Sequence, residues 1–180
     1  MNNSSSSASP PTGDVPAKPK SLEKHSRSAA RIASVQALYQ METADTGVAR
    51  TIEDFTTYWM TGTPQPADED GAAPLDLRHA DQDLFTRIVT GVVETQSCID
   101  PYLERQLAKG WTLKRLDATA RAILRAALYE IIREPGIPAK VIIDEYISLS
   151  HAFFDGDEPK FINGVLDAAV REARADEVSR

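Results

Sequence analysis

Apolar residues recur at intervals of three and four positions along most of this chain, and that spacing constrains the fold more than any other feature. The pattern is clearest in residues 117–134, DATARAILRAALYEIIRE, in which Ala120, Ile123, Ala127 and Ile131 fall on one side of a helix. No run of alternating apolar and polar residues reaches the length of a strand. The sequence therefore predicts an all-α protein that folds as a compact helical bundle.

Local start and stop signals divide this pattern into separate helices. Ser21 can cap the first helix, Asp117 supplies an acidic first turn, and Pro138 suits the first turn of a later helix. Gly110 and the pair Pro135-Gly136 are typical of helix ends. We expect helices to begin near Ser21, Arg50, His79, Asp117, Pro138 and Asp157.

Two segments interrupt or precede the helices and set the domain boundaries. Residues 1–20 contain four prolines and no apolar period, so we expect a disordered polar tail. Residues 61–74, TGTPQPADEDGAAP, are rich in proline, glycine and acidic side chains, which predicts an exposed acidic loop or insertion. One helical domain is expected over residues 21–176, followed by a C-terminal tail of residues 177–180.

Composition excludes several classes of protein. The longest apolar runs span only a few residues, far short of the ~20 that a helix needs to cross a bilayer. The N-terminal segment lacks the apolar region of a secretory signal, and the single cysteine, Cys98, excludes an internal disulfide framework. His25, His79 and His151 have no metal-type spacing, and no phosphate-binding or nucleophile motif occurs. We therefore expect a cytoplasmic protein without membrane association, and an enzyme is the weaker interpretation.

The charge of the chain is distributed unevenly. The whole chain carries a net charge of −7, yet residues 18–40 carry +4, because five cations there face one acid, Glu23. Arg27 and Arg31 are four residues apart and so lie on one helix face, with Lys24 near them. A basic segment on an acidic body favours an anionic partner at one place only. The alternative is a solvated helix face that follows a polar tail.

Three strings, taken in order and with their spacing, resemble the NusB family of bacterial transcription antitermination factors. The resemblance covers residues 25–174, with gaps around the acidic loop. The strings are VQALYQ (35–40), ARAILRAALYEI (120–131) followed by IPAKVIIDEYISLS (137–150), and KFINGVLD (160–167).

This resemblance implies a fold, a function and a set of partners. The fold would be a bundle of two three-helix subdomains that binds RNA without a cofactor. The function would be to bind the boxA element of ribosomal RNA leader transcripts together with NusE, a small-subunit ribosomal protein. The complex would join RNA polymerase with NusA and NusG and suppress termination during ribosomal RNA synthesis. Some family members form homodimers, so the monomer and the homodimer both remain open.

The family's RNA-contacting segment is an arginine-rich start of the first helix. Here it matches HSRSAAR, in which Arg27 and Arg31 keep the arginines while Ser28 and Ala29 replace others. Fixed cations would hold backbone phosphates, while rings and amides would contact splayed bases. The candidate RNA-binding residues are Lys24, Arg27, Arg31, Gln36, Tyr39, Lys160, Phe161 and Asn163. Packing of the two aromatic side chains into the core is the alternative for Tyr39 and Phe161.

A protein-docking surface is expected on the side of helix 121–133 that carries Arg125, Tyr129 and Glu130, away from its apolar stripe. A plain solvated face is the alternative, because surface charge pairs need no partner.

Two other functions also remain open. One is the enzyme class, since NusB-like domains also begin ribosomal RNA cytosine methyltransferases, although 180 residues leave too little length for a methyl-donor domain. The other is an interaction module that docks a protein and ignores RNA.

Overall fold

The computed structural model describes residues 20–61 and 77–178. The described residues are helical, with turns and loops between the helices and no strand among them, so the all-α prediction is confirmed. Apart from Lys20 and Thr61, the expected N-terminal tail and acidic loop lie outside the described residues. No helix within the described ranges is long and apolar enough to cross a membrane.

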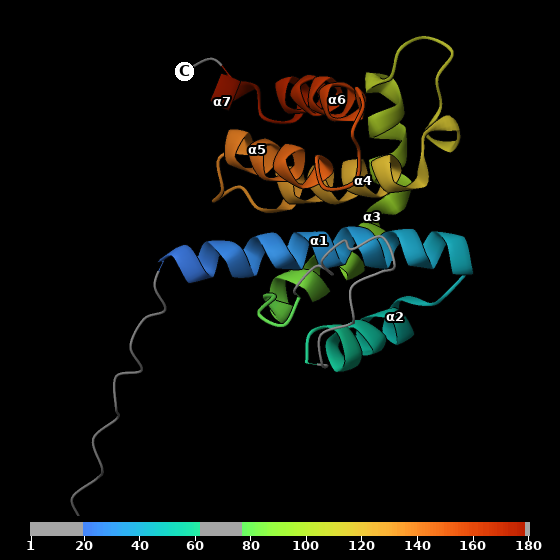
Figure 1. Ribbon diagram of the computed structural model, residues 1–180. Coiled ribbons are helices and arrows are strands. Elements are labelled where there is room, and N and C mark those ends of the chain that lie inside the picture. The colour runs from blue at the N-terminus through green and yellow to red at the C-terminus, as the bar shows by residue number, and fades with distance from the viewer. Residues whose placement is uncertain (1–19, 62–76, 179–180) are drawn as a thin grey trace, which may run out of the picture.

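Seven α-helices and two short turns of other helical types follow one another along the described chain (Figure 1). The α-helices are α1 (Lys20–Ala44), α2 (Val48–Asp54), α3 (Gln82–Gln106), α4 (Ala118–Arg133), α5 (Ala139–Ser150), α6 (Glu158–Ala173) and α7 (Ala175–Val178). A π-helical turn, η1 (Phe55–Trp59), continues α2, and a 3-10 turn, η2 (Leu113–Arg115), lies between α3 and α4.

The helices form two groups of three that share one core. Helices α1, α2 and α3 pack together, and α4, α5 and α6 pack together, while α4 also packs against both α1 and α3. Figure 1 shows α1 running between α2 on one side and the group of α4, α5 and α6 on the other. Because α1 and α3 also contact α4, side chains of α4 outside its apolar stripe are covered by other helices as well.

Local sequence signals account for where the helices begin. The carboxylate of Asp117 accepts hydrogen bonds from the backbone N–H groups of Thr119 and Ala120 at 2.8 and 3.2 Å, and so caps α4 as expected. The start of α3 differs from the expected His79, because the Asp81 side chain accepts a hydrogen bond from the Leu84 N–H at 2.9 Å. Helix α3 therefore begins at Gln82.

Candidate nucleic-acid interface

The exposed cations at the beginning of α1 form the core of the candidate RNA site. Arg27 is exposed, and the Lys24 side chain is 74% exposed with its Nζ 3.6 Å from a carboxylate oxygen of Glu145 on α5. No other Lys24 ion pair and no Arg27 ion pair occurs among the described residues. These two side chains present positive charge to solvent, as an RNA phosphate requires.

Arg31 does not belong to this exposed surface, so the expectation that it faces RNA is wrong. Arg31 is only 4% exposed, although it lies about one helical turn from Arg27. Its Nε and Nη2 atoms donate to the two carboxylate oxygens of Glu130 on α4 at 2.9 and 2.8 Å. Burial by itself lowers the pKa of Arg31, but the hydrogen bonds and charge of Glu130 more than offset it, and the pKa is raised.

Glu130 is the buried partner of Arg31, so its expected place on an exposed docking face is also wrong. The residue is 0% exposed, and its Oε1 accepts a second hydrogen bond from the Tyr146 hydroxyl on α5 at 2.9 Å. Burial, followed by the charge of Glu130, raises the pKa of Tyr146 well above its usual value, so the phenol stays a donor. The three side chains join α1, α4 and α5 in the core.

A second carboxylate, that of Glu145 on α5, lies against the basic start of α1. It accepts a hydrogen bond from the Ser28 hydroxyl at 2.6 Å. Its oxygens also lie 3.6 Å from Lys24 Nζ and 3.6 Å from Arg31 Nη1. Part of the positive charge predicted for this ridge is therefore balanced from within the protein. Sequence spacing contained no signal for this contact, because Ser28 and Glu145 are 117 residues apart.

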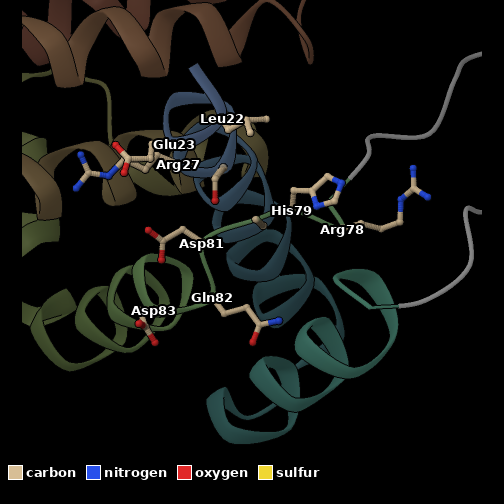
Figure 2. A pocket seen from close by; sticks show the side chains of 10 residues that line it. Leu22, Glu23, Arg27, Arg78, His79, Asp81, Gln82 and Asp83 are labelled. Carbon is tan, nitrogen blue, oxygen red and sulfur yellow. The ribbon is translucent and has the colours of Figure 1, made fainter. Parts of the chain in front are cut away.

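A hollow of about 940 Å³ opens beside Arg27, between the first turns of α1 and the start of α3 (Figure 2). The Asp81 N–H donates to the Ser26 carbonyl at 3.0 Å and joins the two walls. Both cationic and anionic side chains line the hollow, including those of Arg27, Arg78 and Asp83. Such a mixture of donors and acceptors suits base edges better than it suits phosphates alone.

The remaining α1 candidates lie farther along the helix. Gln36 is partly exposed, and Tyr39 is 42% exposed, so its ring is only partly packed in the core. Both are accessible to a ligand, but they lie two to three turns beyond Arg27. The structure thus separates the α1 candidates into a cationic start and a later amide and ring.

The candidate RNA-binding residues on α6 make no hydrogen bond to the α1 candidates among the described residues. Lys160 is exposed and donates to Asp157 at 2.9 Å, and the Asn163 amide donates to Asp167 at 3.1 Å. Phe161 is 38% exposed. Helix α6 packs against α3, α4 and α5. The hydrogen bonds of Lys160 and Asn163 thus stay within their own part of the chain, and their role in RNA binding stays a prediction.

The expected docking face of α4 is largely covered by α1 and α3. The Arg125 side chain is 13% exposed, and its Nη2 lies 2.7 Å from Asp100 while its Nη1 lies 3.0 Å from Glu42. Burial by itself lowers the pKa of Arg125, but the hydrogen bond and charge of Asp100 outweigh it and raise the pKa. The Tyr129 ring packs over Gly91 of α3. Spacing along α4 alone showed which residues leave the apolar stripe, but not that other helices cover them.

The sequence profile of the NusB family matches residues 28–171. The chain belongs to the NusB family. The transcription antitermination protein NusB of Bartonella tribocorum is 45% identical over 156 residues, which cover 87% of this chain and 94% of that protein. The protein of the same name from Maricaulis maris is 46% identical over 151 residues, which cover 84% of this chain and 89% of that protein. These relatives carry the name of an antitermination factor, which supports the non-enzymatic interpretation of this NusB-family chain.

Solved structures support the same fold. The NusB of T. maritima is 29% identical and superposes with a TM-score of 0.66, covering 86% of this chain and 97% of that one. A structure of antitermination factors NusB and NusE in complex with dsRNA matches with a TM-score of 0.60 at 19% identity, covering 81% and 96%. At that identity the likeness shows the NusB fold alone.

Proposed function

We propose that this NusB-family protein binds boxA RNA of ribosomal RNA leader transcripts together with NusE, and thereby helps RNA polymerase to read through terminators. Antitermination is the role named for its relatives. The observation that carries the RNA-binding step is the pair of exposed cations, Lys24 and Arg27, at the start of α1 on an otherwise acidic protein. Assembly with NusA and NusG belongs to the same proposal.

The proposed contact is mainly electrostatic. Two exposed cations neutralise few phosphates, so affinity should be modest and sensitive to salt. NusE would bring a second RNA-contacting protein next to this one and raise the effective affinity. The net negative charge of the protein would repel RNA from acidic parts of the surface and so favour binding at its cationic parts.

Removing both exposed cations should weaken RNA binding. For Lys24→Ala with Arg27→Ala we expect a higher Kd and a salt slope reduced by about 1.4, since each phosphate contact to a single strand contributes about 0.7. Fluorescence anisotropy titrations of boxA RNA at several salt concentrations measure both quantities. Arg31 is left intact, because its removal would leave the buried Glu130 carboxylate without a balancing cation.

The matched control for that double variant is Lys140→Ala with Arg171→Ala. Both side chains are exposed, lie on α5 and α6, and make no ion pair among the described residues. The control changes the net charge by the same amount but at positions outside the proposed site. It should therefore alter the Kd much less. Equal losses in the two double variants would show that only the net charge of the protein matters, against a site at the start of α1.

Neutralising Glu145 should strengthen RNA binding. Glu145→Gln removes the carboxylate next to Lys24, while its amide oxygen can still accept from Ser28. Partly exposed ion pairs contribute up to about 1 kcal/mol, so we expect the Kd to fall by about twofold to fivefold. The neighbouring Asp144→Asn makes the same charge change at an exposed position and is the control. The same decrease in both variants would contradict a specific effect of Glu145.

A further inference from the structure

An exposed tryptophan lies in the connection between α3 and α4, far along the chain from the proposed RNA contacts. Trp111 is 48% exposed, and the guanidinium carbon of Arg115 lies 5.1 Å from its ring centroid. The neighbouring apolar side chains, Leu113 and Leu116, are buried, so this ring is not part of an apolar patch. An isolated exposed ring stacked on a guanidinium calls for an explanation other than core packing.

Hydrogen bonds order the backbone that carries this ring and hold the guanidinium next to it. The Trp111 N–H donates to the Ala108 carbonyl at 3.0 Å, and Arg115 Nη1 donates to the Gly110 carbonyl at 2.8 Å. Gly110 has a φ of +87°, a left-handed conformation that glycine adopts without strain, and this turns the chain ahead of Trp111. The ring therefore extends from an ordered turn, with the guanidinium held against that turn by the Gly110 carbonyl.

The charged side chains next to Trp111 in the chain are positive, although Lys114 also borders a hollow lined by Glu42, Asp100 and Glu104. Lys109, Lys114 and Arg115 are exposed, residues 108–116 contain no acid, and none of these cations forms an ion pair among the described residues. The nearest acids in sequence contact backbone instead. The Glu104 carboxylate accepts a hydrogen bond from the Leu113 N–H at 3.4 Å, and the Asp117 carboxylate caps α4. The cations are thus available to an anionic ligand.

We infer that Trp111, with Arg115 behind it and Lys109 and Lys114 beside it, is a stacking platform for an unpaired base of single-stranded RNA. A ring that stacks a base, flanked by cations that hold phosphates, is the arrangement that single-strand-binding proteins use. A protein partner would require an apolar centre, and the neighbouring leucines are buried. The inference rests on the proposed RNA-binding function but uses none of the residues assigned to it.

The platform lies at the other end of α1 from Lys24 and Arg27. Arg121 pairs with Glu42, near the end of α1, and its Nη1 donates to the carbonyls of Leu113 and Leu116 at 2.7 and 2.9 Å. Arg27 and Glu42 are 15 residues apart, roughly 22 Å along a helix. Figure 1 shows the α3–α4 connection on the side of the molecule where α1 ends. One RNA strand that contacts both ends would gain affinity through its effective concentration.

The test uses the fluorescence of Trp111 in the full chain. The sequence has two tryptophans, so Trp59→Phe leaves Trp111 as the single emitter. We expect single-stranded RNA that carries boxA and its flanking nucleotides to quench this emission to saturation. In the same background, Trp111→Ala should raise the Kd measured by anisotropy by between about fivefold and about 150-fold, and Trp111→Tyr should restore most of the loss. Thermal melting checks that each variant is folded.

Two outcomes would overturn the platform. One is unchanged Trp111 emission when anisotropy shows that the RNA is bound, a result that needs no substitution at Trp111. The other is quenching by polyglutamate but not by RNA, which would make this a surface for an acidic protein. The Lys24→Ala and Arg27→Ala background separates this inference from the proposed α1 site. If quenching persists there with an unchanged Kd, the platform stands and the α1 site fails.

Discussion

Glu130→Gln is expected to lower the free energy of unfolding by about 3–5 kcal/mol, because the buried Arg31 guanidinium loses its directly bonded countercharge and keeps only the more distant Glu145 carboxylate, 3.6 Å from its Nη1. Proteins of this size have a total stability of only about 5–15 kcal/mol, so the variant would be close to unfolding at moderate temperature. Urea unfolding followed by circular dichroism measures the change as a lower midpoint at constant slope.

Two further variants sharpen this prediction. Glu145→Gln makes the same chemical change at a partly exposed carboxylate that also contacts Arg31, and it should cost less than about 1 kcal/mol. Replacing both buried partners, as Arg31→Met with Glu130→Leu, should recover much of the loss, because no uncompensated charge remains. A loss below about 1 kcal/mol for Glu130→Gln would contradict this prediction, because it would mean that Glu145 or water balances the Arg31 charge without Glu130.

Gly91→Ala is the second substitution with a large expected effect. A Cβ built at Gly91 would overlap the end of the Tyr129 ring, so the ring, or α3 and α4 with it, must shift. We expect a loss of about 1–3 kcal/mol from overpacking, even though alanine favours a helix over glycine by about 1 kcal/mol. Urea unfolding measures the change. In Gly91→Ala with Tyr129→Ala, the total loss should be smaller than the sum of the two single losses.

Gly164→Ala is the matched control, because a Cβ there meets nothing within 4 Å. The same substitution in α6 should therefore stabilise the protein by up to about 1 kcal/mol. Opposite signs at the two glycines would identify the contact with Tyr129 as the cause. If both glycines responded alike, helix propensity would explain the result and the close approach of α3 to α4 would not.

Much of the fold follows from local pattern. The start of α4 at Ala118, its end at Arg133 and the start of α5 at Ala139 agree with the expected signals, because caps and proline act on adjacent residues. The ordered strings that resemble the NusB family are also a property of the linear sequence. The close helix approach at Gly91 had no such signal, since its partner Tyr129 is on another helix.

The candidate site was predicted only in part, and Arg27 and Arg31 show why. The sequence alone determined that both are arginines on one face of a helix, because a spacing of four residues is only slightly more than one turn. Only the tertiary structure decided that Arg27 is exposed while Arg31 is paired with Glu130, 99 residues away in the chain. Helical periodicity is set by neighbouring residues, whereas the freedom of a charge depends on which distant carboxylate packing brings against it.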